Sequence, residues 1–412
     1  MRKRNGQLRA AFHVIIQDPT WASPTSHAAC SSHSRRRATP LLNIVSPPRT
    51  IAYGTGSEQF AELYLPSDAT TDKAIPVVCL IHGGFWQTPY TLELMRPVAH
   101  DLCRSGVAVW NVEYRRCGPT GGGGGFSTTQ ADVCAAVDWL AGDAARSYGL
   151  DASRVALVGH SAGAQLALWS AQRRALPEAA GGAGGDSELT ADALGEATAL
   201  RSSLASTQRR VRPRCIVSAG GVLDLAFARS DPRQPQGRRA VESFLSGGDR
   251  ISDAALNARL ALSSPIDLLP PAATSERRRE PRWLGVSLDD VGIWSEGEPV
   301  LGLVHGLRDP IVPADHSTRF AVAASVADVE CTYRQVRSEG HFEVLDPASA
   351  SWRAVRAIVA ESGVLPSREE ETATAAAGVA SASDRSLALP KSMTAERRET
   401  SEEVILVTRR RE

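Results

Sequence analysis

Residues 154–163 read Arg154-Val155-Ala156-Leu157-Val158-Gly159-His160-Ser161-Ala162-Gly163, an apolar run followed by a serine between two glycines. The apolar run predicts a strand, and the alanine-rich continuation Ala164–Trp169 predicts a helix. A serine on a tight strand-to-helix turn has the form of a nucleophile elbow, in which flanking glycines let the backbone fold sharply. The N-terminus of the following helix adds partial positive charge. We therefore interpret Ser161 as a nucleophile; the alternative is a glycine-rich loop with an incidental serine.

Short β-rich runs alternate with helical patterns, which predicts an α/β fold with a mainly parallel sheet flanked by crossover helices. The expected strands are Phe60–Leu65, Val77–His82, Val107–Val112, Val155–Val158, Cys215–Ala219, Val300–Val304 and Thr332–Val336. Two segments interrupt this alternation. Residues 173–212, which contain a glycine run, and residues 270–298, which are rich in Pro, Arg and Glu, are expected to be surface insertions.

The two ends of the chain differ in composition from the expected folded domain at residues 51–364. Residues 1–50 are rich in Arg, Ser and Pro, which is typical of a disordered extension or of a targeting segment. Residues 365–412 alternate charge runs with Ala, Ser and Thr, and we expect them to form a disordered tail.

Bulk composition narrows the class of partner. The 412 residues carry a formal net charge of zero, so no basic or acidic excess indicates nucleic acid or an anionic membrane. No apolar run reaches the roughly 18 residues of a membrane span. The seven cysteines are scattered without a C-x-x-C pair, which predicts reduced thiols, no metal centre and an intracellular protein. We expect a cytoplasmic location, or an organellar one if the basic N-terminal segment is a targeting sequence.

A nucleophilic serine needs a general base. His341 lies in Ser338-Glu339-Gly340-His341-Phe342, directly after the last expected strand, where a loop can carry its imidazole back over the sheet. His160 is adjacent to Ser161, but on a tight turn its side chain is expected to point away from Oγ. His100, on an expected helix, is interpreted as structural.

The base in turn needs a carboxylate that holds its tautomer and orientation. Asp309 follows the expected strand Val300–Val304 and is the first candidate, with Asp224 and Asp315 as the alternatives. The order Ser161, Asp309, His341 along the chain is the order expected for an α/β-hydrolase.

The segment His82-Gly83-Gly84-Phe85-Trp86 follows another expected strand and is the candidate oxyanion loop. Consecutive glycines let backbone N–H groups approach a developing alkoxide. We expect the donors to be Gly84, with Gly83 or Phe85, and Ala162 after the nucleophile. Phe85 and Trp86 are candidate walls of the substrate pocket; for Trp86 the alternative is a packing role, and His82 is expected to hold the loop by hydrogen bonding.

Five motifs together resemble α/β-hydrolase esterases related to kynurenine formamidase: His82-Gly83-Gly84-Phe85-Trp86, Glu113-Tyr114-Arg115-Arg116, Gly159-His160-Ser161-Ala162-Gly163, His305-Gly306 with Asp309, and Gly340-His341-Phe342. The resemblance covers roughly residues 51–362. It implies an α/β-hydrolase fold, a triad of Ser161, Asp309 and His341, and oxyanion positions at Gly84 and Ala162. It also implies that Glu113 and Arg115 are structural and pair near the oxyanion loop.

These features predict a serine hydrolase that needs no cofactor and acts on a small carboxylic ester or an aryl formamide resembling N-formylkynurenine. Three alternatives stay open: a general carboxylesterase of short acyl esters, an acyltransferase, and a non-catalytic α/β-hydrolase fold that binds a ligand or partner. The oligomeric state does not follow from the sequence.

Overall fold

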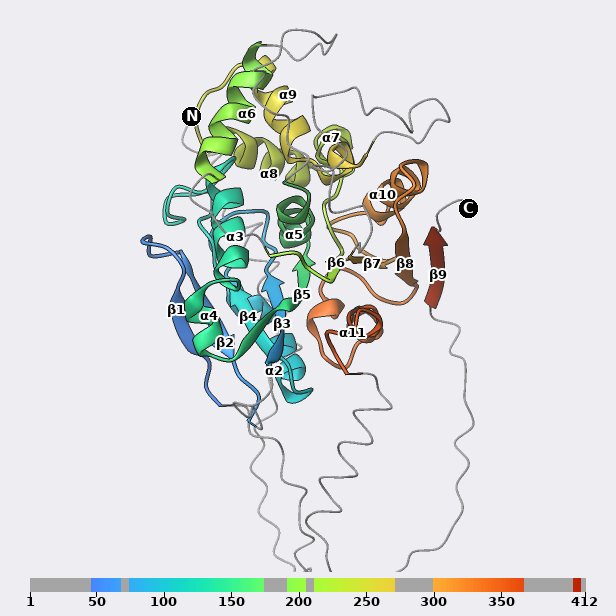
Figure 1. Ribbon diagram of the computed structural model, residues 1–412. Helices are drawn as coiled ribbons and strands as arrows, with labels where there is room; N and C mark the ends of the chain where they lie inside the picture. The colour runs from blue at the N-terminus through green and yellow to red at the C-terminus, as the bar shows by residue number, and fades with distance from the viewer. Residues whose placement is uncertain are drawn as a thin grey trace, which may run out of the picture. The chain divides into compact units, whose positions relative to one another are not determined.

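The apolar runs of the sequence form one sheet in the computed structural model, which describes residues 46–67, 74–173, 191–204, 211–270, 299–366 and 403–408 (Figure 1). The strands are β1 (Arg49–Ala52), β2 (Phe60–Tyr64), β3 (Ile75–Ile81), β4 (Ala108–Val112), β5 (Leu150–His160), β6 (Cys215–Ala219), β7 (Val300–Gly306), β8 (Cys331–Val336) and β9 (Glu403–Thr408). Their order is β1-β2-β4-β3-β5-β6-β7-β8-β9. The five pairings β4–β3, β3–β5, β5–β6, β6–β7 and β7–β8 are parallel. The pairings β1–β2, β2–β4 and β8–β9 are antiparallel. The expected mainly parallel sheet is confirmed.

Strand β3 shows why the central strands are almost continuously apolar. Val77, Cys79 and Ile81 point into one core cluster, while Val78 and Leu80 point into the other. Helices α3 (Thr128–Trp139) and α5 (Ala162–Gln172) cover the first face, and α2 (Arg96–Arg104) and α11 (Ala350–Glu361) cover the second. A parallel strand that is covered on both faces needs apolar side chains on both.

The other helical elements of the described residues complete the fold. They are η1 (Leu92–Met95), α4 (Asp143–Ser147), α6 (Ala191–Leu204), α7 (Leu225–Ser230), α8 (Pro235–Ser246), α9 (Asp253–Ser263), η3 (Pro265–Leu268), α10 (Asp315–Val326) and η5 (Glu343–Leu345). Helix α9 contacts α6, α7 and α8, and these four helices form a group at the top of Figure 1. No helix in the described ranges is long and apolar enough to cross a membrane.

All seven expected strands are present, with shifted ends, and two further strands were not expected. The largest shift is at β5, which begins at Leu150 and not at Val155. Strand β1 begins at Arg49, two residues before the expected start of the domain. Strand β9 lies within the segment expected to be a disordered tail, and it pairs antiparallel with β8 from Val336↔Glu403 to Cys331↔Thr408. The apolar run Val404–Val407 was the sequence signal for this strand. Residues 1–45 and 367–402 lie outside the described residues.

The segment 173–212 is not a structureless insertion, because it contains α6. Ala197 and Leu200 of α6 are buried, and the helix contacts α3 and α9. Both flanks of the segment meet at Asp138 on α3: Arg173 donates to its carboxylate at 2.6 Å and the Val211 N–H at 3.2 Å. The second expected insertion, apart from its first residue, lies outside the described residues.

Candidate active site

Ser161 occupies a strained turn between β5 and α5. Its backbone has φ 55° and ψ −120°, a conformation that a residue with a side chain rarely adopts. The turn is tight because α5 packs directly on the sheet: a Cβ at Gly163 would lie 2.1 Å from the carbonyl oxygen of Ile81, and one at Gly159 would lie 2.3 Å from that of Gly163. The Ser161 N–H donates to the Ala219 carbonyl of β6 at 2.9 Å. These contacts give the segment the backbone geometry of a nucleophile elbow.

The structure brings His341 and Asp309 together. Nδ1 of His341 lies 2.6 Å from Oδ2 of Asp309, although 32 residues separate them in the chain. A carboxylate can only accept, so Nδ1 carries the proton and the lone pair of the neutral ring is on Nε2. This is the tautomer that a general base needs, and Asp309 holds it in place.

The Asp309 carboxylate is saturated with donors. Its Oδ1 accepts the N–H groups of Ile311 and Val312, each at 2.8 Å, and its Oδ2 also lies 3.3 Å from Nε2 of His305. Burial by itself would raise the pKa of Asp309, but the hydrogen bonds of His305 and His341 hold it well below its ordinary value. Asp309 is therefore ionised at neutral pH and can stabilise a charged His341.

The two alternative acids lie in other contacts. The Asp224 carboxylate caps α7 by accepting from the Phe227 N–H at 2.8 Å, and it pairs with Arg319 at 2.7 Å. Asp315 is half exposed at the start of α10 and lies 3.4 Å from Arg233. Neither carboxylate has a contact with His341 among the described residues, which leaves Asp309 as the candidate.

A hydrogen bond between the His160 ring and the backbone of His341 joins the Ser161 elbow to the loop that carries His341. No hydrogen bond joins Ser161 Oγ to His341 in the part of the chain that the structure describes; such contacts are often long before substrate binds. Nε2 of His160, however, lies 2.9 Å from the His341 carbonyl oxygen. Gly220 follows Ala219, whose carbonyl accepts the Ser161 N–H, and it lies beside His341 and Asp309. A Cβ at Gly220 would be 3.4 Å from His341 Nδ1.

The loop after β3 is the candidate oxyanion loop, and its backbone is unusual. Gly84, Phe85 and Trp86 have φ of 114°, 57° and 57°, values that residues with a side chain rarely adopt. The N–H groups of Gly84 and Phe85 form no backbone hydrogen bond with a described residue, and Ala162 is the first residue of α5, so its N–H has no partner within the helix. A Cβ at Gly83 would lie 2.8 Å from Cβ of Ser161, which places this loop against the nucleophile.

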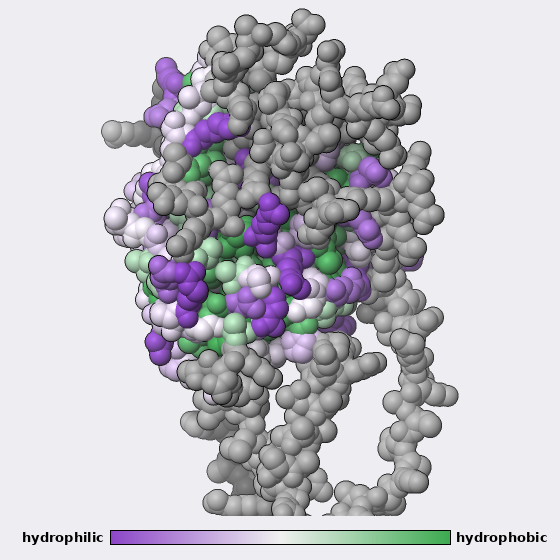
Figure 2. Space-filling view, in the orientation of Figure 1, coloured by the Kyte–Doolittle hydropathy of each residue, from purple (hydrophilic) through white to green (hydrophobic). Residues whose placement is uncertain are grey.

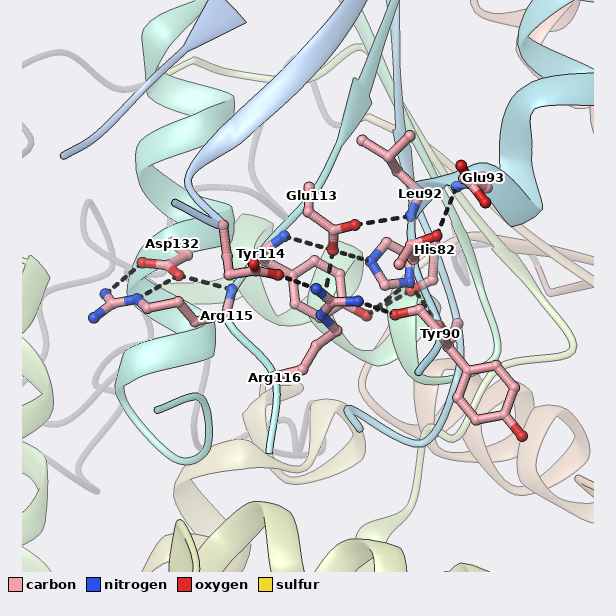
Figure 3. Close-up of polar contacts among 12 residues, drawn as sticks. His82, Tyr90, Leu92, Glu93, Glu113, Tyr114, Arg115, Arg116 and Asp132 are labelled. Atoms are coloured by element: carbon pink, nitrogen blue, oxygen red, sulfur yellow. Dashed lines mark hydrogen bonds and ion pairs between the residues drawn. The ribbon is translucent and has the colours of Figure 1, made fainter. Parts of the chain in front are cut away.

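A buried cluster of polar contacts around Glu113 supports the loop (Figure 3). Nε2 of His82 lies 2.9 Å from Oε1 of Glu113, and the His82 ring stacks on Tyr114 with a centroid distance of 4.2 Å. Glu113 also accepts the Leu92 N–H at 3.1 Å and lies 3.4 Å from Nε of Arg116. Burial alone would raise the pKa of Glu113, but the neighbouring His82 and Arg116 lower it. The expected loop-holding role of His82 agrees with these contacts.

The arginine that faces Glu113 is not the expected one. Arg115 points away from the loop and forms a two-point ion pair with Asp132 of α3, at 2.8 and 2.6 Å, at the left of Figure 3. Arg116 takes the place beside Glu113 and also pairs with Glu58. The alternation of a strand would place Arg115, two residues after Glu113, on the same side as Glu113. Strand β4 ends at Val112, so this alternation does not hold for residues 113–116, and the sequence alone could not assign the partner.

The two candidate pocket aromatics differ in their surroundings. Trp86 is 1% exposed, its indole N–H donates to Gln165 at 2.9 Å, and its ring stacks on Phe244, which favours the packing alternative. Phe85 is half-buried on the loop itself. The exposed aromatic of the region is Phe342, which meets the His341 ring edge-on at 5.0 Å. Phe342 directly follows the histidine in the chain, but no local sequence pattern indicates its contact with the ring.

The described surface is otherwise mixed in polarity. On the face shown in Figure 2, hydrophilic residues are interspersed with hydrophobic ones. Phe342 and Leu307, which both lie in loops at the carboxyl ends of β7 and β8, are two of the large apolar side chains exposed in the described ranges. Among the same residues, no group of three or more His, Cys, Asp or Glu side chains is arranged to hold a metal ion, and the six cysteines there form no disulfide.

The mainly parallel sheet with an elbow serine after a central strand defines an α/β-hydrolase. The chain belongs to the BD-FAE family of α/β-hydrolase esterases, whose family model matches residues 61–270, about half of the chain. The expected esterase class is thereby confirmed, and the closer resemblance to kynurenine formamidase stays a prediction.

Curated relatives match a shorter part of the chain. A probable isoprenylcysteine alpha-carbonyl methylesterase of Oryza sativa subsp. japonica is 31% identical over 134 residues, which is 32% of this chain and 30% of that protein. Its namesake from Arabidopsis thaliana is 28% identical over 134 residues, which is 32% of this chain and 26% of that protein. The match therefore spans less than a third of the length of these relatives.

Solved structures share the fold. A truncated carbohydrate esterase from gut microbiota superposes with a TM-score of 0.54 at 18% identity and covers 78% of this chain and 98% of its own. Esterase B from Lactobacillus rhamnosis gives a TM-score of 0.55 at 17% identity, with 79% of this chain and 88% of its own covered.

Proposed function

We propose that this protein is a serine carboxylesterase in which Ser161 is the nucleophile, His341 the general base and Asp309 the residue that orients the base. The observation that carries the proposal is the 2.6 Å contact between His341 Nδ1 and Asp309, which leaves the Nε2 lone pair available. The strained elbow at Ser161 and the glycine loop packed against it support the same assignment.

The reaction proceeds by two acyl transfers. His341 Nε2 takes the Ser161 hydroxyl proton as Oγ attacks the ester carbonyl, and the resulting oxyanion accepts from the N–H groups of Gly84 and Ala162, with Gly83 or Phe85 as the further donor. His341 then gives its proton to the leaving alcohol as the carbon–oxygen bond breaks. Water repeats the sequence on the acyl-enzyme and releases the carboxylic acid and free Ser161.

The substrate class is an ester of a small acyl group. An exposed Phe342 beside His341 and a half-buried Phe85 on the oxyanion loop offer apolar surface next to the reacting carbonyl. The curated relatives are named methylesterases and the structural neighbours esterases, which supports an ester. An aryl formamide is the second candidate, and it is supported by the His82–Trp86 motif alone.

Purified protein should be assayed against p-nitrophenyl acetate, p-nitrophenyl octanoate and N-formylkynurenine, with Ser161→Ala as the matched control. We expect turnover of the acetate that exceeds turnover of the octanoate and disappears in the variant. Formylkynurenine turnover that is also lost in the variant would extend the assignment to formamides. Hydrolysis that survives Ser161→Ala undiminished would refute the assignment of the nucleophile.

A further inference from the structure

His160 lies between the Ser161 elbow, the loop that carries His341 and the candidate oxyanion loop. It is the last residue of β5 and is 1% exposed. Its ring centroid is 4.7 Å from that of His341 and 6.2 Å from that of Phe342. The other edge of the His160 ring faces the oxyanion loop, because a Cβ added at Gly83 would lie 2.9 Å from Nδ1. One buried imidazole therefore contacts both the loop of the base and the loop of the oxyanion site.

The proton of this ring is located by its partners. Nε2 lies 2.9 Å from the His341 carbonyl oxygen, which can only accept, so Nε2 carries the hydrogen and donates it. Nδ1 is buried and has no hydrogen-bond partner among the described residues. A buried ring with a single polar contact holds its neighbour at that contact, because breaking the bond would leave the N–H and the carbonyl both unsatisfied.

We propose that His160 is a positioning residue of the esterase: its Nε2–H bond to the His341 carbonyl sets the distance between the imidazole of the base and the Ser161 elbow. The inference rests on the proposed function. His160 adjoins Ser161 in the chain, so this bond ties the nucleophile turn directly to the loop that carries the base, across 181 residues of sequence.

The charge state of His160 suits this role. Burial, and next the neighbouring His341, lower the pKa of His160 to about 3, so the ring stays neutral at the pH at which an esterase works. A charged ring in this position would repel the His341 imidazolium that forms during each acyl transfer. A neutral donor orients the loop without that penalty.

Two amide substitutions separate the bond from the bulk of the side chain. In His160→Gln the amide nitrogen reaches the place of Nε2, whereas in His160→Asn the shorter amide reaches only the place of Nδ1. We expect kcat for p-nitrophenyl acetate to fall about tenfold to a hundredfold in His160→Asn with KM little changed, because a base displaced by about 1 Å costs rate rather than binding. His160→Gln should recover most of this loss.

The rate of phosphonylation of Ser161 by a fluorophosphonate gives a second readout, since it reports the serine and base pair without a natural substrate. It should fall in parallel with kcat in His160→Asn. His100→Leu, a change at a half-buried histidine of α2 that packs on Tyr64, is the control for losing an imidazole elsewhere and should leave both rates unchanged.

Two results would overturn the inference. One is a His160→Asn variant with wild-type kcat and phosphonylation rate while Ser161→Ala is inactive, which would leave the proposed function intact. The other is an equal loss in His160→Gln and His160→Asn with an equally lowered free energy of unfolding, which would make the role of the ring one of core packing. Activity that persists in Ser161→Ala would instead refute the proposed function itself.

Discussion

The substitution Gly83→Ala tests whether the oxyanion loop must lie against the elbow. The new Cβ would lie 2.8 Å from Cβ of Ser161 and 2.9 Å from both Nδ1 and the carbonyl oxygen of His160. Carbon atoms in ordinary contact are about 3.5 Å apart, so the loop or the elbow must move by about 0.7 Å. Two of these three atoms, the Cβ of Ser161 and the carbonyl oxygen of His160, are held by the backbone of the elbow and cannot rotate away.

This displacement acts on the N–H donors of Gly84 and Phe85, which follow directly. Misplacing an oxyanion donor or a reacting group by this amount costs about 10²-fold in rate, and overpacking costs about 1–3 kcal/mol of stability. We therefore expect kcat for p-nitrophenyl acetate to fall by about two orders of magnitude. The free energy of unfolding, measured by urea titration, should fall by about 1–3 kcal/mol.

Gly195→Ala is the matched control, because no atom of the described residues outside the backbone of its own helix lies within 4 Å of a Cβ at that position. It should leave kcat unchanged and leave the protein as stable or about 0.5–1 kcal/mol more stable. If Gly83→Ala keeps wild-type kcat and stability, the loop does not pack on the nucleophile as the structure has it, and the oxyanion assignment built on that contact is wrong.

In Asp309→Asn the N–H groups of Ile311 and Val312 hold the amide oxygen, so the NH2 group faces His341 and cannot accept from Nδ1. This loss of the His341 tautomer should lower kcat by about four orders of magnitude; a loss below tenfold in the ester assay would exclude Asp309 as the orienting acid. Glu113 has a lowered pKa in the folded state, so its contribution to stability is complete above its unfolded pKa of about 4.3 and is lost as the pH falls through the folded value. As the pH falls from about 6 to about 3, the free energy of unfolding of Glu113→Gln should therefore decrease less than that of the wild type, as measured by urea titration. An identical pH dependence in the two proteins would contradict an ionised Glu113 in the folded state. Trp86→Phe removes the donor to Gln165 and should lower stability by about 1–3 kcal/mol while leaving KM unchanged; a raised KM would restore the pocket-wall interpretation.

Local signals were sufficient for most of the sheet. The apolar runs Val77–Ile81 and Val155–Val158 could be recognised because strands covered on both faces must be apolar throughout. Strand β9 was missed because its neighbours in sequence are polar, and pairing with β8 decides its conformation. Helix α6 was missed for the related reason that its pattern is weak and that burial against α9 stabilises it.

The elbow and the glycine loop could be recognised from the local sequence, which also predicts the order of serine, acid and histidine. Those features depend on steric needs within a few residues, such as the positive φ at Ser161. Only the tertiary structure decided which carboxylate meets His341 and which ring holds its loop. Asp224, Asp309 and Asp315 all follow strands or begin helices, so local pattern does not separate them. The contact of His160 with a carbonyl 181 residues away exists only because β5 and the loop after β8 end at the same edge of the sheet.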